Sequence, residues 1–182
     1  SFAHALKDAL REDPDVILIG EMRDIETTSI AMNAAETGHL ILSTMHANNT
    51  YEAISRIIDI FPQDQQNQIK IQLSNVLLGA ISQRLINRID GVGRIPAVEI
   101  LIGTPAIRKM ISQNQYKDIL EQIEKSVIHY GMQSLEQSLL ALLANKMINL
   151  DEARNTTLRQ SEFDLMREQL GISELGGFRS LN

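Results

Sequence analysis

The stretch Asp15-Val16-Ile17-Leu18-Ile19-Gly20-Glu21-Met22-Arg23-Asp24 joins four branched apolar residues to an acid. A run this short and this rich in β-branched residues predicts a strand buried on both faces, as in a parallel sheet covered by helices. An acid directly after such a strand lies at its carboxyl end, where open α/β sheets bind ligands. Glu21 is therefore a candidate to hold a metal ion or orient a water molecule. The alternative is an ordinary buried strand with charged ends.

A second apolar run, residues 39–44, predicts another buried strand, which the polar loop 45–50 follows. If both strands are parallel, the side chains at their ends meet at one edge of the sheet. That edge would combine a carboxylate, hydroxyls and an imidazole, which suits a phosphorylated ligand and its metal. A lone histidine is more often a structural or surface group, and its pairing with an acid favours function. The side chains concerned are Glu21, Ser43, Thr44 and His46.

Composition narrows the class of protein. The 182 residues carry a net charge of -6, so nucleic acid is not expected as a partner. The sequence has no cysteine, which excludes disulfides and thiolate metal sites. It has no apolar run of the length that a membrane span needs, and no signal-peptide pattern at its start. Because the pattern begins at Ser1-Phe2-Ala3 without an initiator Met, we expect part of a longer protein.

Local patterns divide the chain into an α/β half and a helical half. Asp24 is expected to cap one helix, and the Asp90-Gly91 pair predicts a hairpin turn. Thr104-Pro105 and a capping box at Ser134 begin further helices. The expected helices of the first half cover residues 1–12, 25–36, 51–60 and 64–83, and the hairpin strands cover 84–89 and 97–101. The predicted domains are an α/β domain over 1–102, a helical subdomain over 103–171 and a flexible tail over 172–182.

Several segments resemble, in order along the chain, the secretion ATPases, the hexameric motors of type II and type IV secretion and of type IV pili. Residues 13–24 resemble their Walker B box, and residues 43–48 resemble their His box. The further similar segments are residues 34–39, 56–62 and 82–85. The resemblance extends over residues 1–155, so it is far more specific than a single motif.

Within this family, the chain most resembles the PilT-like pilus-retraction branch. Residues 103–108 match its C-terminal signature, and residues 131–135 are a further similarity. Assembly and type II export ATPases usually carry a four-cysteine zinc motif, whereas this chain has a hairpin there and no cysteine. The alternatives are a pilus assembly or type II secretion ATPase and, in a different class, an interaction module without catalytic activity.

The resemblance implies the C-terminal portion of a RecA-like P-loop ATPase core, with a parallel sheet, flanking helices and a hairpin, followed by an all-α subdomain. It implies ATP and Mg²⁺ as cofactors. Glu21 would be the Walker B acid that holds Mg²⁺ through water, and His46 would lie near the γ-phosphate. Gly20 and Thr44 would complete this part of the nucleotide site.

The resemblance also implies roles for residues other than these four. Arg23 and Arg56 would contact phosphate or a neighbouring subunit, and the alternative is that each forms a surface ion pair. The signature residues Ala106, Ile107 and Arg108 would dock a helix or transmit motor output rather than catalyse.

The printed sequence contains no G-x-x-x-x-G-K-[ST] phosphate loop. The family's Asp box and N-terminal PAS-like domain are also absent, and we expect all three to precede Ser1. The chain would then be the C-terminal part of a longer motor and inactive alone. The whole motor would be a cytoplasmic homo-hexamer. It would lie peripherally at the inner membrane against a pilus platform protein and would not bind nucleic acid.

Overall fold

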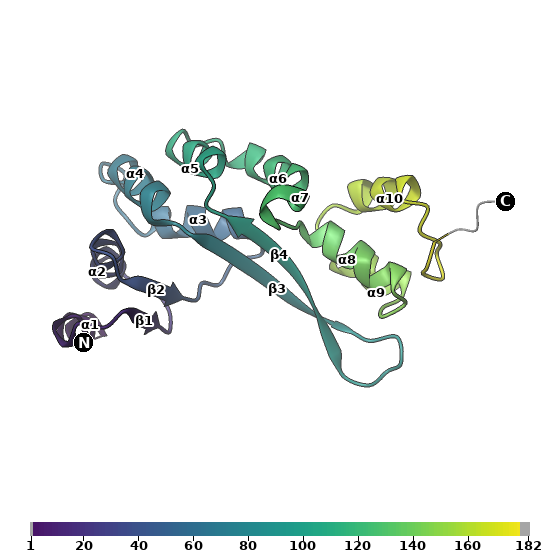
Figure 1. Ribbon diagram of the computed structural model, residues 1–182, viewed down its shortest axis with the longest axis horizontal. Coiled ribbons are helices and arrows are strands. Elements are labelled where there is room, and N and C mark those ends of the chain that lie inside the picture. The colour runs from purple at the N-terminus through teal and green to yellow at the C-terminus, as the bar shows by residue number, and fades with distance from the viewer. Residues whose placement is uncertain (1, 179–182) are drawn as a thin grey trace. The chain divides into compact units, whose positions relative to one another are not determined.

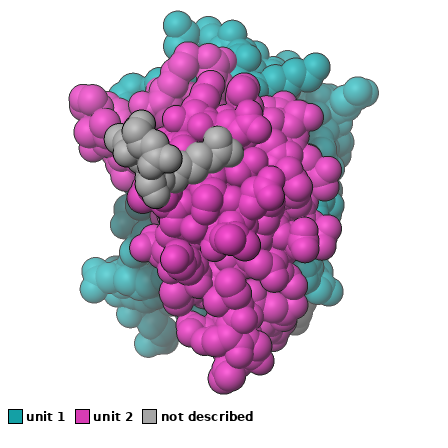
Figure 2. Space-filling model, turned by 90° about the vertical axis from the view of Figure 1, so that its right-hand side faces the viewer, with its two compact units in different colours: residues 1–80, 102–120 teal, residues 81–101, 121–182 magenta. Residues whose placement is uncertain are grey.

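The structure, a computed structural model, describes residues 2–178. It divides into two compact units, coloured separately in Figure 2. The first unit comprises the residues up to 80 together with 102–120, and the second comprises 81–101 and the residues from 121 onwards. The strands of the hairpin and one helix therefore begin in one unit and end in the other.

The first unit contains a short parallel sheet and its helices (Figure 1). Its elements are α1 (Phe2–Ala9), a 3₁₀ helix (Leu10–Glu12), β1 (Val16–Ile19), α2 (Ile25–Glu36), β2 (Leu40–Ser43), α3 (Thr50–Asp59), α4 (Gln66–Val76), α5 (Pro105–Ser112) and the first half of α6 (Tyr116–Lys125).

Strands β1 and β2 are parallel, as predicted, and Ile19 pairs with Ser43 in their register. The prediction that β1 is buried on both faces is wrong, and so is the prediction that β2 is buried, because its residues are exposed or half-buried. Ile17 and Ile19 are buried against Leu6 of α1 and Ala31 of α2, whereas Leu18 is 74% exposed. The reason is that the helices cover only one face of this two-stranded sheet. Its opposite face presents exposed apolar side chains, which are Val16, Leu18, Leu40 and Leu42.

Helices α2 and α3 begin at side-chain caps. The Asp24 carboxylate accepts a hydrogen bond of 2.8 Å from the backbone N–H of Thr27, so α2 begins at the predicted residue. Asn49 caps α3 in the same way through the N–H of Glu52, also at 2.8 Å. These caps determine where the chain turns after each strand, and both turns contribute to the site described below.

The predicted helix over residues 64–83 is too long. Helix α4 ends at Val76, and residues 79–87 form strand β3 (Gly79–Asn87), which pairs with β4 (Arg94–Ile102) in a two-stranded sheet. The apolar residues of this segment fit the spacing of a helix as well as that of a strand. The segment forms a strand because it pairs with β4. The predicted hairpin is confirmed: Gly91 has φ +71°, and the carboxylate of Asp90 accepts the N–H of Val92 at 3.0 Å.

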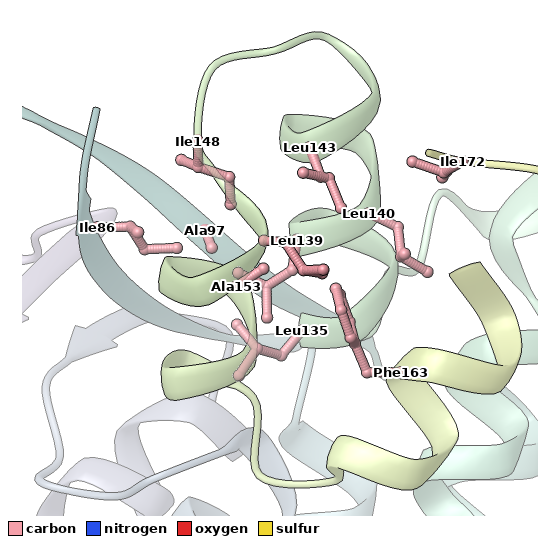
Figure 3. Packing of buried hydrophobic residues seen from close by; sticks show 11 residues of the cluster. Ile86, Ala97, Leu135, Leu139, Leu140, Leu143, Ile148, Ala153, Phe163 and Ile172 are labelled. Carbon is pink, nitrogen blue, oxygen red and sulfur yellow. The ribbon is translucent and has the colours of Figure 1, made fainter. Parts of the chain in front are cut away.

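The second unit is mainly helical and has its own apolar core. After most of the hairpin it contains the second half of α6, then α7 (Val127–Tyr130), α8 (Leu135–Ala144), α9 (Leu150–Thr156) and α10 (Gln160–Gln169). Figure 3 shows Leu139 and Leu143 of α8 packed with Ala153 of α9 and Phe163 of α10. The predicted capping box at Ser134 begins α8.

The two units do not follow the predicted boundary at residue 102, because most of the hairpin belongs to the second unit and α5 to the first. The first residues of the predicted flexible tail are folded: Ile172 is buried in the second core and forms a β-bridge with Phe178. The remainder of that tail, residues 179–182, lies outside the described residues. None of the helices between residues 2 and 178 has the length and apolar character that a membrane span requires.

Candidate functional site

Glu21 and His46 meet at the carboxyl ends of the two parallel strands. Glu21 follows β1 by two residues, and His46 follows β2 by three. The imidazole Nε2 of His46 lies 3.6 Å from Oε1 of Glu21. The guanidinium of Arg23 lies 2.6 Å from the other carboxylate oxygen, Oε2. One oxygen of Glu21 is thus paired with a permanent cation and the other faces a titratable ring.

These side chains line one open cavity of about 420 Å³ within the first unit. Its lining combines two acids, two arginines and a histidine with apolar side chains, a mixture that suits a charged ligand with an apolar part. The lining residues are Glu21, Met22, Arg23, Met45, His46, Arg56, Asp59 and Ile60. Four of the residues named from the sequence, Glu21, Arg23, His46 and Arg56, therefore face the same space.

The pKa of Glu21 is lowered from its ordinary value. The main cause is the hydrogen bond that Arg23 donates to the carboxylate. Burial acts second and in the opposite direction, and the charges of Arg23 and His46 lower the pKa further. The carboxylate is therefore ionised at neutral pH, which is the state needed to accept a hydrogen bond from a metal-bound or attacking water.

Thr44 ties the two loops of the site together. Its hydroxyl donates a hydrogen bond of 2.5 Å to the backbone carbonyl of Gly20. This bond joins the residue after β2 to the residue that precedes Glu21. Gly20 and Thr44 do not line the cavity. They hold in place the backbone that presents Glu21 and His46.

Arg56 lies on α3, the helix that follows β2 in the chain. Its Nε and Nη2 donate to Oε1 of Glu52 at 2.9 and 2.6 Å, an i,i+4 pair on one face of the helix. The other oxygen of Glu52 accepts the backbone N–H of Asn48 at 2.9 Å. Arg23 and Arg56 thus each form an ion pair with a nearby acid, which is the alternative given in the sequence analysis. Both also line the cavity.

Asp59 is a lining residue that the sequence analysis did not single out. It lies three positions after Arg56 in the last turn of α3, so the helical spacing already places both side chains on neighbouring parts of one face. That spacing is a signal in the sequence, but nothing in the sequence indicates that this face of α3 lies against the loops after β1 and β2.

The signature residues Ala106, Ile107 and Arg108 lie on α5 and do not line the cavity. Ile107 is fully buried. Arg108 donates through Nε to the carbonyl of Gly103 at 2.7 Å and through Nη1 to the carbonyl of Asn75, so it caps the end of α4.

Gly103 makes this junction possible by its lack of a side chain. A Cβ at this position would lie 2.0 Å from the carbonyl oxygen of Leu77, which is backbone and cannot move aside cheaply. The signature segment therefore packs α5 closely against the end of α4.

The carboxylate oxygens of the cavity suit a magnesium ion that is held through water. Within the described residues, no three acidic or histidine side chains converge to bind a metal ion. Glu21 offers one ionised carboxylate, and its Oε1 lies 3.6 Å from Nε2 of His46. Mg²⁺ commonly keeps most of its waters and takes one or two carboxylates together with phosphate oxygens.

Known proteins share much of this sequence and fold. Residues 1–94 match the model of the family described as Type II/IV secretion system protein. The chain is 44% identical over 153 residues to a Pseudomonas aeruginosa protein named type IV pilus retractation ATPase PilT, covering 84% of this chain and 44% of that protein. It is also 44% identical over 154 residues to a twitching motility protein of Neisseria gonorrhoeae, covering 85% of this chain and 41% of that protein.

A solved structure gives the same relationship in three dimensions. The crystal structure of the pilus retraction motor PilT with bound ADP superposes with a TM-score of 0.82 at 44% identity, covering 91% of this chain and 46% of that one. The chain therefore spans less than half the length of each of these relatives.

Proposed function

Since the chain belongs to the type II/IV secretion system protein family, we propose that it forms part of a motor ATPase that drives type IV pilus retraction. The observation that carries the proposal is the meeting of Glu21, Arg23 and His46 at the carboxyl ends of two parallel strands, where all three line a charged cavity. The names of the relatives supply the direction of the motor: they are a pilus retraction ATPase and a twitching motility protein.

In this proposal Glu21 is the Walker B acid. Arg23 keeps its carboxylate ionised and held on one side, so that Oε1 is available to a water molecule. Bound Mg²⁺ would neutralise phosphate charge and lower the barrier to phosphoryl transfer. Glu21 would hold that ion through water and help to orient the attacking water. His46, next to Oε1, would contact the terminal phosphate of ATP.

The neighbouring residues position this pair or add charge. The hydrogen bond from Thr44 to Gly20 holds both loops at the nucleotide. Arg23 and Arg56 would contact phosphate or an adjacent subunit, since each lines the cavity while its own acid holds it in place. Ala106, Ile107 and Arg108 would transmit motor output through the junction between α5 and α4.

We further propose the assembly and place of work of the whole motor. It would be a homo-hexameric ring, because ring motors close through head-to-tail interfaces with sites between subunits. It would work in the cytoplasm, peripherally at the inner membrane against the pilus platform protein, and would not require nucleic acid.

The central test is substitution of the two proposed catalytic residues in the intact motor. Glu21→Gln removes the charge that holds Mg²⁺ and orients water, and His46→Ala removes the phosphate contact. We expect each to lower kcat for ATP hydrolysis by about 100-fold or more with an unchanged far-UV spectrum. Glu12→Gln, an exposed acid outside the cavity, is the control. Normal turnover by both Glu21→Gln and His46→Ala would contradict the assignment.

The 182-residue chain by itself should hydrolyse no ATP. The printed sequence contains no phosphate loop, so the triphosphate would lack the backbone amides that cradle it. The measurement is phosphate release from ATP and Mg²⁺ by the purified chain, with heat-inactivated protein as the background. Turnover that is abolished by Glu21→Gln would show that this proposal of inactivity is wrong.

A pilus assembly or type II secretion ATPase is the second candidate, because the matched family includes both secretion types. Deletion of the gene separates the two. Loss of twitching with excess surface pili supports retraction, whereas loss of the pili themselves supports assembly.

A further inference from the structure

The carboxylate of Glu52 holds a different group with each of its two oxygens. Glu52 lies in the first turn of α3, and its side chain is 26% exposed. Its Oε2 accepts hydrogen bonds from the backbone N–H and the side-chain Nδ2 of Asn48, each at 2.9 Å. Its Oε1 accepts Nε and Nη2 of Arg56 at 2.9 and 2.6 Å. One side chain thus joins the loop before α3 to an arginine one turn further along the helix.

Both of the held groups belong to the candidate site. Asn48 follows His46 by two residues in the loop after β2, and Arg56 lines the cavity together with His46. At the other end of this loop, the hydroxyl of Thr44 is bonded to the carbonyl of Gly20 at 2.5 Å. The segment that carries His46 is therefore fixed both before and after the ring. Fixing a loop in advance reduces the ordering that a ligand has to impose on it.

Glu52 is in the charge state that this double role requires. Its pKa is lowered, first by the hydrogen bond from the backbone N–H of Asn48 and then by the one from Arg56. The carboxylate is therefore ionised at neutral pH, and both of its oxygens accept hydrogen bonds. An amide in the same place would offer one accepting oxygen and one donating NH₂ group.

The start of α3 is capped independently of the Glu52 carboxylate. The side chain of Asn49 supplies the cap by accepting the N–H of Glu52 at 2.8 Å. Helix α9 begins with the same pair, since Asn149 accepts the N–H of Glu152 at 2.8 Å. There the acid accepts a hydrogen bond from Asn87 of β3, at 3.2 Å, and does not line the cavity. Glu152 is therefore a matched control for Glu52.

We propose that Glu52 is a positioning residue of the nucleotide site, which holds the loop of His46 with one oxygen and Arg56 with the other. The inference rests on the proposed function, because that function makes the terminal phosphate of ATP the ligand of both groups. The negative charge of Glu52 repels phosphate, so Glu52 acts through the two groups that it holds. It keeps them at a fixed spacing before the nucleotide arrives, which is the arrangement that favours catalysis.

Replacement of Glu52 by glutamine in the intact motor tests this role. Glutamine has nearly the same shape, but it cannot accept hydrogen bonds from both groups at once. The charge of the terminal phosphate changes in the transition state, so misplaced donors should lower kcat rather than raise KM. We expect kcat to fall about tenfold and the KM for ATP to change less than about twofold. Glu152→Gln should keep the kcat of the unmodified motor.

A double variant shows whether Glu52 acts through Arg56. In an Arg56→Ala background, the remaining proposed task of residue 52 is to accept the N–H of Asn48, which glutamine can also do. Adding Glu52→Gln to Arg56→Ala should therefore lower kcat by less than about twofold. A further tenfold loss would show that Glu52 acts independently of Arg56 and would overturn the proposal.

Amide hydrogen exchange of the purified chain tests the hold on the loop. Glu52→Ala removes both oxygens, so the backbone N–H of Asn48 should exchange about tenfold faster than in the unmodified chain. Glu152→Ala is the control and should leave this rate unchanged. An unchanged rate in Glu52→Ala would mean that the carboxylate does not hold the loop, and the proposal would be wrong.

The outcomes separate this inference from the proposed function. If Glu21→Gln abolishes turnover while Glu52→Gln keeps the full kcat, the proposed function stands and the role of Glu52 is overturned. Equal losses of kcat in Glu52→Gln and Glu152→Gln would also overturn it, because they would reflect a general effect at a helix start. Normal turnover in both Glu21→Gln and His46→Ala would contradict the proposed function itself, and the inference would fail with it.

Discussion

At the scale of the residue, the site depends on how the oxygens of one carboxylate are divided. Arg23 holds Oε2 of Glu21 at 2.6 Å, and Oε1 is turned towards His46. Both strand-end residues were predictable, because polar residues that follow parallel strands meet at one edge. The partner of each oxygen was not predictable, since it depends on side-chain rotamers that only the folded loops determine.

The ion pair with Arg23 predicts a measurable titration. Because the pKa of Glu21 is lowered, the favourable interaction is complete above the ordinary glutamate pKa and is lost as the pH falls through the lowered value. Arg23→Ala removes the main cause, so the pKa of Glu21 should rise towards its ordinary value. Carboxyl ¹³C NMR of the purified chain measures it. Arg11→Ala, in the 3₁₀ helix, is the control. An unchanged pKa in Arg23→Ala would refute this explanation.

At the scale of the element, capping residues predicted where helices begin, whereas strand pairing determines where α4 ends. Asp24 and Ser134 cap α2 and α8 through hydrogen bonds within a few residues of each cap. The end of α4 is different, because residues 79–87 become a strand only by pairing with β4. A helical spacing of apolar residues could not reveal that partner.

A charged cluster joins three helical segments of the second unit. Arg159, which precedes α10, donates to Glu124 of α6 at 2.5 Å and to the buried Glu136 of α8 at 2.7 Å. The hydroxyl of Thr157 also donates to Glu136, at 2.9 Å. Arg159 is 35 residues from Glu124 and 23 residues from Glu136, and its one guanidinium neutralises part of the charge of both acids.

Removing that guanidinium should destabilise the second unit. Arg159→Ala leaves two acids near each other with one of them buried, so the free energy of unfolding should fall by about 3 kcal/mol. Urea denaturation followed by circular dichroism measures the change. Lys125→Ala, which breaks an exposed i,i+4 pair with Glu121, should cost less than about 1 kcal/mol. Equal effects of the two substitutions would show that the cluster adds no more than a surface ion pair.

At the scale of the whole molecule, each of the two compact units contains a cluster of buried apolar side chains among its described residues. One lies between the parallel sheet and helices α1 and α2, and the other lies among α8, α9 and α10 (Figure 3). The sequence analysis expected an α/β half and a helical half with a division at residue 102. The compact units assign most of the hairpin to the helical half instead. The composition of the sequence does not show which unit the hairpin packs against. Without the contacts, the hairpin is naturally grouped with the strands that precede it.

Separate cores predict separate responses to a core substitution. Leu139→Ala removes a fully buried side chain from the second core and should cost about 3 kcal/mol there. Amide hydrogen exchange should accelerate at Leu143 and stay unchanged at Ile19, which belongs to the first core. Leu165→Ala, at an exposed position of α10, is the control. Faster exchange at both amides would mean that the two cores unfold as one.

The sequence by itself determined the features that depend on neighbouring residues. These are the helix caps, the turn at Asp90-Gly91, and the acid and histidine placed just after two apolar strands, together with the order of motifs that indicated the family. Only the tertiary structure decided which face of β1 is covered, where α4 gives way to β3, and that Asp59 shares a cavity with Glu21. Each of these depends on contacts between segments far apart in the chain, and local spacing does not encode such contacts.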